Sequence, residues 1–364
     1  MKKERVLVAM SGGLDSSVAA MLLHEQGYEI VGITMKVWDY EILGNDAPDT
    51  GCCNLDAIND ARTVAVNLGF PHYVLDLRSE FEEIVISDFV SEYLKGRTPN
   101  PCVLCNTYMK WDALLRKADQ LDCKYIATGH YAQIRYESDR YILFKGADTN
   151  KDQSYVLWNL SQEKLARTLL PLGKFSKPQI KEMAAKRGYE KIANKRESFD
   201  ICFIPDNDYR SFLRKKIPNI ENIVGEGDFV NSDGKYLGKH KGFPFYTIGQ
   251  RKGLNIAMGI PYYVTKIDAI DNIITLGPKE ELEGQTMFLK DINLIKYDKL
   301  PADFKALVKI RYKDAGSYAI VNQNKNSIEV KFTLPVSAIS PGQSSVIYQD
   351  DDVVAGGIIN FELK

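Results

Sequence analysis

A glycine turn between a strand and a helix, near the start of the chain, limits the fold more than any other stretch. Val6 to Ala9 form an apolar run that predicts a buried parallel strand. Ser16 to Gln26 predict a helix with apolar positions Val18, Met21 and Leu22. A strand, a glycine turn and a helix start direct several backbone N–H groups at one point, where an oxyanion can bind. The sequence therefore predicts a phosphate site on an α/β sheet.

The turn itself reads Ser11-Gly-Gly-Leu-Asp-Ser16. It lacks the Gly-Lys-Ser/Thr ending of an NTPase P-loop and the G-x-G-x-x-G spacing of a dinucleotide site, so the simplest forms of both are excluded. An ordinary glycine turn with an Asp or Ser helix cap is the alternative interpretation. The pattern resembles the pyrophosphate-loop ATPases, which adenylate an oxygen and release pyrophosphate. The resemblance implies that Asp15 acts on Mg²⁺ or pyrophosphate, and that ATP contacts Ala9, Met10, Ser11, Gly12, Gly13, Leu14, Asp15 and Ser16.

Helix and strand patterns alternate through the next hundred residues. Strands are predicted at 29–37, 73–77 and 125–128, and helices at 56–68 and 81–94. This order predicts a Rossmann-like parallel sheet with helices on both faces. Because nucleotides bind at the carboxyl ends of such strands, we expect Met35 and Gly129 to contact adenosine. The alternative is that they are an ordinary Met and Gly at strand ends.

From about residue 220 the helical pattern gives way to short alternating runs, such as 262–267 and 273–276, which predict a β-rich region. Further strands near 305–312, 327–332 and 345–348 predict a small antiparallel barrel at the C-terminal end. The stretch from Lys239 to Gly253 mixes basic, aromatic and glycine residues, as RNA-binding segments do, although basic loops are often only solvated. We expect three domains: an ATP-binding catalytic domain over 1–215, a central β-rich domain over 216–281, and a β-barrel over 282–364.

Charge and cysteine content narrow the class of protein. The 47 Lys and Arg nearly cancel the 48 Asp and Glu, so a nucleic acid would be held by a local basic face. No run of about 18 apolar residues and no signal-peptide pattern are found, so we expect a cytoplasmic protein without a membrane partner. Cys102 and Cys105 have zinc-ligand spacing but no second pair accompanies them, so we expect no metal ligands.

The stretch from Gly96 to Asn106 is predicted to be a loop by its glycine and prolines. Cys105 then precedes a predicted helix over 110–121, and a thiol near a helix N-terminus has a lowered pKa. The alternative is that Cys105 is merely a small buried residue. Cys202 lies in a second long predicted loop, 194–206, far from Cys105 in the sequence.

Eight motifs taken together resemble the tRNA-specific 2-thiouridylase family. They span nearly the whole chain in the family's order, so the resemblance is specific. The motifs are Ser11-Gly-Gly-Leu-Asp-Ser16, Gly96-Arg-Thr-Pro-Asn-Pro101, Leu104-Cys-Asn106, Ala127-Thr-Gly-His-Tyr131, Lys151-Asp-Gln-Ser154, Asp200-Ile-Cys-Phe-Ile204, Thr247-Ile-Gly-Gln-Arg-Lys-Gly253 and Pro341-Gly-Gln-Ser344.

The resemblance implies a two-step reaction at the wobble uridine of tRNA. ATP and Mg²⁺ adenylate the C2 oxygen, and sulfur from a cysteine persulfide then replaces that oxygen. Cys202 would carry the persulfide, supplied by a sulfur-donor protein, and Cys105 would act on it and end as its disulfide partner. Asn100, Pro101 and Cys102 match the segment that touches the target base. The resemblance also makes the central β-rich domain over 216–281 a tRNA-binding domain. Other tRNA contacts would be His130, Lys151, Asp152, Gln153, Arg311, Tyr312 and Gln343.

One departure from the family pattern leaves a second route open. Cys102 stands where some family members have Asp, so an acid at this position is dispensable or is replaced by a thiol. Cys102, Cys105 and Cys202 could also ligate an iron–sulfur cluster with one open iron. Two other classes remain: a different pyrophosphate-loop synthetase, which has no need of paired thiols, and a nucleotide- or RNA-binding module without catalysis.

Overall fold

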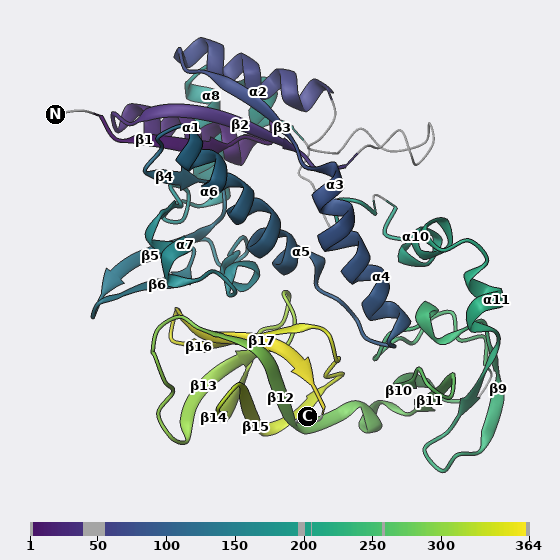
Figure 1. Ribbon diagram of the computed structural model, residues 1–364. Helices are drawn as coiled ribbons and strands as arrows, with labels where there is room; N and C mark the ends of the chain where they lie inside the picture. Colours follow the sequence, from purple (N-terminus) through teal and green to yellow (C-terminus); the bar gives the residue numbers. More distant parts are fainter. Residues whose placement is uncertain (1–2, 39–54, 196–200, 205, 257–258, 362–364) are drawn as a thin grey trace. The chain divides into compact units, whose positions relative to one another are not determined.

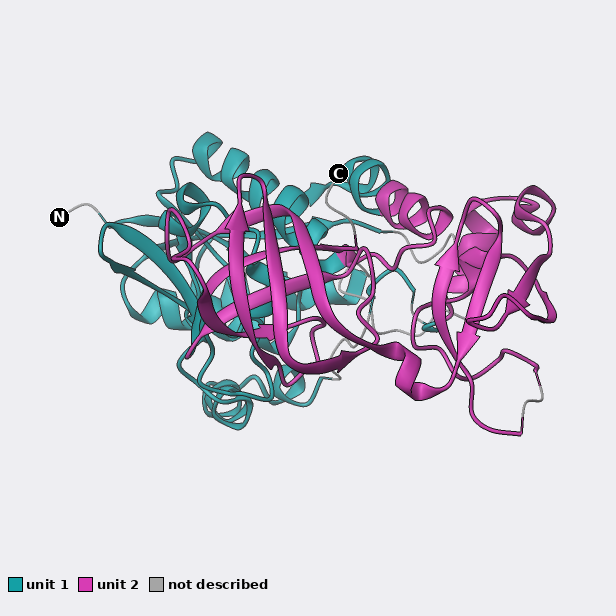
Figure 2. Cartoon of the chain, turned by 90° about the horizontal axis from the view of Figure 1, so that it is seen from below, with its two compact units in different colours: residues 1–85, 102–207, 351–353 teal, residues 86–101, 208–350, 354–364 magenta. Residues whose placement is uncertain are grey.

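The computed structural model describes residues 3–38, 55–195, 201–204, 206–256 and 259–361 (Figure 1). Cys52, Cys53 and part of the predicted loop before Cys202 lie outside these ranges. The chain divides into two compact units (Figure 2). Unit 1 comprises residues 1–85, 102–207 and 351–353, and unit 2 comprises 86–101, 208–350 and 354–364. The three-domain division at 215 and 281 stays a prediction.

Unit 1 is built on a five-stranded sheet in the order β3-β2-β1-β4-β7. All four pairings in this sheet are parallel. The strands are β1 (Arg5–Ala9), β2 (Glu29–Lys36), β3 (His72–Asp76), β4 (Tyr125–Ala127) and β7 (Thr168–Leu169). The predicted parallel sheet is therefore confirmed, with the strand before the glycine turn at its centre.

Helices cover both faces of this sheet. Val6 and Val8 of β1 pack into a core with apolar residues of α1 (Leu14–Glu25), α2 (Leu55–Leu68) and α8 (Lys177–Lys186). Leu7 alternates to the other face and is also fully buried, where α6 (Trp111–Gln120) contacts β1 and β4. Near-continuous apolar strands such as β1 suit this two-sided burial.

The helix predicted over 81–94 is interrupted. The structure has α3 (Arg78–Phe81), a π-helical turn η2 (Glu82–Ile86) and α4 (Ser87–Leu94) in its place. The other elements of unit 1 include the hairpin β5 (Ala132–Glu137) and β6 (Arg140–Lys145), which the sequence analysis missed, and the segments η4 (Ser154–Leu157), α7 (Gln162–Ala166) and α9 (Glu190–Ala193).

The loop predicted over 96–106 is wrong in its second half. The structure begins a helix at Pro101, as α5 (Pro101–Leu104), and continues through the π-helical segment η3 (Cys105–Lys110) into α6. Proline favours the first helical position because its fixed φ suits a helix and its missing N–H would have no partner there. Cys105 therefore lies a full turn inside a helix, instead of just before one.

Unit 2 contains a small four-stranded sheet in the order β10-β11-β8-β9. Its strands are β8 (Gly227–Val230), β9 (Tyr236–His240), β10 (Tyr263–Asp268) and β11 (Ile273–Gly277). Helix α10 (Tyr209–Lys216) packs on α4 through a Phe89–Phe212 edge contact with ring centroids 5.8 Å apart. The region expected to be free of helix from 220 also holds α11 (Ile220–Val224) and the turns η5 (Phe243–Phe245) and η6 (Lys279–Leu282), which are too short to produce a helical pattern.

The C-terminal part of unit 2 is a closed barrel, as predicted. Its strand order is β12-β15-β14-β13-β16-β17, and a β12–β17 pairing closes the circle. The strands are β12 (Glu283–Leu294), β13 (Phe304–Lys309), β14 (Ser317–Asn324), β15 (Ser327–Ser337), β16 (Ser344–Gln349) and β17 (Asp352–Asn360). Inward side chains such as Val308, Val330 and Ile347 are fully buried and form its core. Across the described ranges, no helix has both the length and the apolar character needed to span a membrane.

Candidate active site

The glycine turn is held by its own serines. The Ser11 N–H donates to Ser16 Oγ at 3.0 Å, and Ser17 Oγ donates to the Gly13 carbonyl at 2.9 Å. Gly13 is the N-cap of α1 and no side chain caps it. The predicted alternative, a turn capped by an Asp or Ser side chain, is therefore wrong. The turn instead presents an uncapped helix start, which suits an anionic ligand.

Two glycines allow close contact between backbone segments at the turn: Gly12 with α2, and Gly129 with the start of α1. Gly12 has φ +69°, and a Cβ there would lie 1.9 Å from the Ala57 carbonyl oxygen of α2. A Cβ on Gly129, after β4, would lie 2.8 Å from the Asp15 carbonyl carbon and 2.9 Å from the Ser16 nitrogen. The fold thus brings the predicted contact Gly129 against the start of α1. Met10 is buried behind the turn, and Met35 lies half-buried near the end of β2.

Asp15 is held by two side chains that sequence analysis did not select. Its Oδ1 accepts a hydrogen bond from the Tyr131 hydroxyl at 2.6 Å. Both carboxylate oxygens accept from Lys177 Nζ, each at 2.8 Å. Lys177 is the first residue of α8 and is only 7% exposed. The sequence shows a Ser-Lys-Pro helix start here, but no local signal directs this side chain to a residue 162 positions earlier.

A second lysine lies beside the turn. Lys195 Nζ donates to the Gly12 carbonyl at 3.0 Å and to Asp60 Oδ2 at 2.9 Å. Lys191 contacts the other oxygen of the same carboxylate at 3.2 Å. The turn therefore lies among cationic groups, which favours phosphate binding.

Two of the predicted tRNA contacts at 151–153 form hydrogen bonds with backbone N–H groups of nearby residues. Gln153 Oε1 accepts from the Tyr131 N–H at 2.9 Å. Asp152 Oδ1 accepts from the N–H groups of Gly146 and Ser154 at 3.0 and 3.1 Å. Lys151 before them is half-buried. Their contact with tRNA stays a prediction, since the carboxylate and the amide oxygen already stabilise the fold.

His130 is kept neutral by its surroundings. Its Nδ1 lies 2.8 Å from Thr128 Oγ1, and its ring centroid lies 5.6 Å from that of Trp111. Burial, together with the positive charge of Lys110, lowers the pKa of His130 to about 3. A neutral imidazole can form hydrogen bonds with a base or stack on it. It carries no positive charge that could attract a phosphate group.

The predicted reactive thiols differ in exposure. Cys105 is 7% exposed at the start of η3, whereas Cys102 and Cys202 are exposed. The neighbouring Asn106 Nδ2 donates to the Val156 carbonyl at 3.1 Å and ties this segment to η4. π-Helical segments are rare in proteins, and those that occur are often found at functional sites. The position of η3 is therefore consistent with a functional role for Cys105.

Three aromatic rings anchor the segment that carries Cys202. Phe203 is buried with its ring centroid 6.2 Å from Trp38 and 5.6 Å from Phe81. Trp38 follows the carboxyl end of β2, so this packing ties the Cys202 segment to that part of the sheet.

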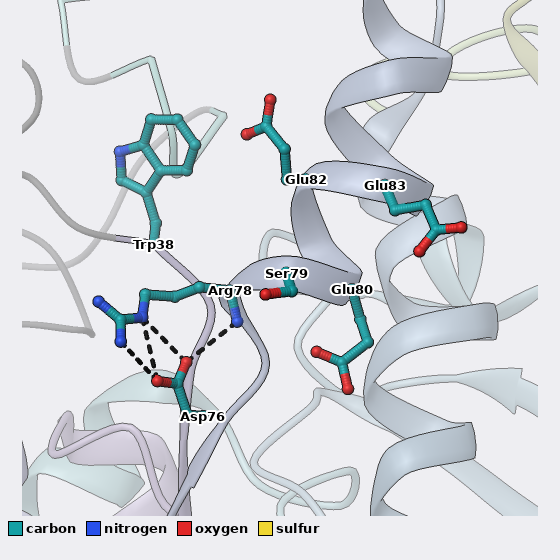
Figure 3. A pocket seen from close by; sticks show the side chains of 7 residues that line it. All are labelled: Trp38, Asp76, Arg78, Ser79, Glu80, Glu82 and Glu83. Atoms are coloured by element: carbon teal, nitrogen blue, oxygen red, sulfur yellow. Dashed lines mark hydrogen bonds and ion pairs between the residues drawn. The ribbon is translucent and has the colours of Figure 1, made fainter.

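An open pocket of about 610 Å³ lies beside Trp38 (Figure 3). In it Arg78 Nε donates to Asp76 Oδ1 at 2.9 Å, and this hydrogen bond lowers the pKa of Asp76 to about 2. The remaining lining is Ser79, Glu80, Glu82 and Glu83. None of the predicted site residues lines this pocket, and its carboxylates would repel phosphate. We therefore assign neither ATP nor RNA to it.

Four predicted site residues of unit 2 lie on its loops, namely Asn100, Arg311, Tyr312 and Gln343. Gln343 Nε2 donates to the carbonyl oxygens of Thr98 and Pro99 at 3.1 and 2.9 Å, so it holds the loop that carries Asn100. Pro101, which follows that loop, is buried as the first residue of α5. Arg311 donates to the Ser337 carbonyl at 2.7 Å, and Tyr312 is 39% exposed.

Three family descriptions match consecutive parts of the chain. The tRNA methyl transferase HUP domain matches residues 4–206. The tRNA methyl transferase PRC-barrel domain matches residues 210–278, and the aminomethyltransferase beta-barrel domain matches residues 284–359. Together they cover nearly every described element.

Similar proteins align with the whole chain. A protein of Amoebophilus asiaticus is 58% identical over 365 residues, covering 100% of this chain and 97% of its own. One from Cytophaga hutchinsonii is 54% identical, covering 100% and 99%, and one from Salinibacter ruber is 56% identical, covering 99% and 95%. Each of the three is named tRNA-specific 2-thiouridylase MnmA.

Proposed function

The chain belongs to the tRNA-specific 2-thiouridylase family, and from this premise we propose how its residues carry out the reaction. The protein is an ATP-dependent tRNA sulfurtransferase that makes 2-thiouridine. One observation carries the proposal: the glycine turn, Gly129, Asp15 and the two lysines converge at the carboxyl end of β1, where a triphosphate is expected.

In the first step the C2 oxygen of the wobble uridine attacks the α-phosphorus of ATP, and pyrophosphate leaves. The uncapped start of α1 and the turn formed by Ala9 to Ser16 would bind the phosphates, while Met35 and Gly129 would contact adenosine. Adenylation converts a poor leaving oxygen into AMP.

Mg²⁺ fits Asp15 in its chemistry. A carboxylate oxygen is the hard ligand that Mg²⁺ prefers, and phosphate oxygens supply further ligands. Asp15 Oδ2 accepts from Lys177 and Oδ1 accepts from Lys177 and Tyr131, so one lone-pair position remains on Oδ2. Bound there, Mg²⁺ would neutralise charge on the phosphates.

In the second step sulfur replaces the adenylated oxygen. A persulfide sulfur-donor protein charges Cys202, whose exposure leaves it accessible. The Cys105 thiolate attacks the inner sulfur of this persulfide, the Cys105–Cys202 disulfide forms, and the terminal sulfur leaves as sulfide. That sulfide adds to C2, and AMP departs with the oxygen. An external thiol then reduces the disulfide.

The uridine would be splayed out of the anticodon loop against Asn100, Pro101 and Cys102. We retain the other predicted tRNA contacts as part of the proposal and place the reaction in the cytoplasm, where its tRNA substrate and sulfur donor would be found. These contacts are His130, Lys151, Asp152, Gln153, Arg311, Tyr312 and Gln343.

Serine variants of the cysteines test the proposal. Cys202→Ser should still release pyrophosphate in the presence of tRNA but should bind no labelled sulfur and make no 2-thiouridine. Cys105→Ser should accept labelled sulfur on Cys202 and then stall. Cys123→Ser is the control, because Cys123 is buried and burial raises the pKa of its thiol to about 11. Full thiolation by both Cys105→Ser and Cys202→Ser would refute the persulfide route.

The iron–sulfur route has less support. Within the part of the chain that the structure describes, which includes Cys102, Cys105 and Cys202, no group of three or more His, Cys, Asp or Glu side chains is placed to hold a metal ion. Iron content of anaerobically purified protein separates the routes. Iron that is lost in each of Cys102→Ser, Cys105→Ser and Cys202→Ser, along with activity, would favour the cluster.

A further inference from the structure

We propose that Lys164 is a positioning residue for the sulfur-transfer step, because it stabilises the π-helical segment η3 that begins with Cys105. This inference rests on the proposed role of Cys105 and deepens it by one residue. Lys164 lies in the short helix α7 and belongs to none of the eight motifs. Its side chain reaches η3 across the fold of unit 1.

The hydrogen bonds of η3 leave one backbone carbonyl without an N–H partner in the helix. The Trp111 N–H donates to the Asn106 carbonyl, five residues back, as in a π-helix. Lys110 is the N-cap of α6, so its carbonyl accepts the first bond of α6, from the Leu114 N–H. The N–H groups of residues 112 and 113 then remain for the three carbonyls of residues 107, 108 and 109. The change from π-helix to α-helix therefore leaves one carbonyl over.

Lys164 supplies the missing donor. Its Nζ donates to the Thr107 carbonyl at 2.7 Å. The same ammonium group lies 2.7 Å from Asp112 Oδ1, in the first turn of α6, and 5.8 Å from the centre of the Tyr108 ring. The side chain of Lys164 is only 17% exposed, so these contacts hold it in place.

This contact favours the π-helix over an α-helix. In a continuous α-helix the Trp111 N–H would bond to the Thr107 carbonyl, four residues back, and no carbonyl would be passed over. A carbonyl that loses water without gaining a donor is destabilising. Lys164 removes this disadvantage of the π-helical arrangement, because it satisfies the Thr107 carbonyl from outside the helix.

The π-helix determines where the Cys105 thiol points. A π-helical turn inserts one residue into an α-helix, so its loss would rotate the preceding residues by about 100° and shift them by about 1.5 Å relative to α6. Cys105 is the first residue of η3 and is 7% exposed. Its thiolate must reach the inner sulfur of the Cys202 persulfide, and a misplacement of about 1 Å can slow a reaction about a hundredfold.

A matched control lies at the end of the same short helix. Arg167, the C-cap of α7, has Nη1 2.7 Å from Asp119 Oδ1, near the end of α6. Its Nε and Nη2 donate to the carbonyls of Lys124 and Cys123 at 3.2 and 3.1 Å. Each cation thus joins α7 to an aspartate of α6 and to backbone carbonyls. Of the two, Lys164 is the one that donates to η3.

The test compares wild type, Lys164→Met and Arg167→Met as full chains. Cys202 is first loaded with labelled sulfur from glutathione persulfide, with release of glutathione, and 2-thiouridine formation is then followed in a single turnover with tRNA and ATP. Lys164→Met should transfer sulfur at least about tenfold more slowly than wild type, because Cys105 is misplaced. Its loading of Cys202 and its tRNA-dependent pyrophosphate release should stay within about twofold of wild type, because neither step uses Cys105.

Arg167→Met should stay within about twofold of wild type in all three assays, because η3 is unchanged. A crystal structure supplies a readout that is independent of the reaction. In Lys164→Met the Trp111 N–H should bond to the Thr107 carbonyl, whereas in Arg167→Met it should still bond to the Asn106 carbonyl.

Three results would overturn the proposal. Equal transfer rates for Lys164→Met and Arg167→Met would show that Lys164 does not position Cys105. A parallel fall in pyrophosphate release would show a general loss of structure at the site. An unchanged bond from Trp111 to Asn106 in Lys164→Met would show that the π-helix does not depend on this lysine.

Failure of the proposed route itself has a different signature. Transfer at the wild-type rate by Cys105→Ser would refute the role of Cys105, whatever Lys164→Met does. If Lys164→Met does not fold, Lys164→Leu takes its place, with the same readouts.

Discussion

Replacing Gly12 by alanine tests whether the phosphate turn depends on a backbone approach that only glycine permits. Two costs are expected. The left-handed conformation at φ +69° lowers the free energy of unfolding by about 1–2 kcal/mol for a residue that has a Cβ. The new Cβ would also lie 1.9 Å from the Ala57 carbonyl oxygen, a backbone atom that cannot rotate away, and overpacking of this kind costs about 1–3 kcal/mol. The sum is about 2–5 kcal/mol.

Gly27→Ala is the matched control for this prediction. Gly27 has φ +88° and no atom within 4 Å of its hypothetical Cβ. Gly27→Ala is therefore destabilised by the left-handed conformation but not by overpacking. Urea unfolding gives the free energy of unfolding of each variant, and ATP titration gives the affinity. Gly12→Ala should lose about 1–3 kcal/mol more stability than Gly27→Ala, and it alone should lose ATP affinity. Equal losses of stability with unchanged ATP binding would refute the reasoning.

Four further predictions follow from contacts in the two units. Asp15→Ala should abolish tRNA-dependent pyrophosphate release, and undiminished release would remove Asp15 from the mechanism. Gln343→Ala should lower the single-turnover thiolation rate about tenfold, because it loses two hydrogen bonds to the loop of Asn100, whereas a loss confined to tRNA affinity would favour direct contact with tRNA. Arg311→Ala should weaken tRNA binding and reduce its salt dependence by about one counterion, as filter binding at several salt concentrations would show. Because the pKa of His130 is about 3 when folded and near 6.5 when unfolded, the unfolded chain binds more protons between these values. Wild type should lose stability as pH falls below about 6.5, and His130→Gln should lose less, as urea unfolding at several pH values would measure.

Local sequence patterns were sufficient for the central elements of the fold. The apolar run before the glycine turn, the alternation of strands and helices, and the short strands after residue 282 predicted the parallel sheet and the barrel, and both are confirmed. Each of these depends on periodicity within one segment, which a sequence displays directly. The loop over 96–106 failed because the two prolines were both interpreted as helix breakers, although Pro101 occupies the one helical position where proline is favoured.

The phosphate turn Ser11-Gly-Gly-Leu-Asp-Ser16 could be predicted from the sequence because the strand, the glycines and the helix start are neighbours in the chain. Gly129 and Lys177 are different, since they meet Asp15 from 114 and 162 residues away. Gly129 could be predicted because it follows a strand of the same sheet, and parallel strands end at one edge. Lys177 could not, because its position depends on how α8 packs against α1, and packing is settled by the fit of side chains from many segments at once.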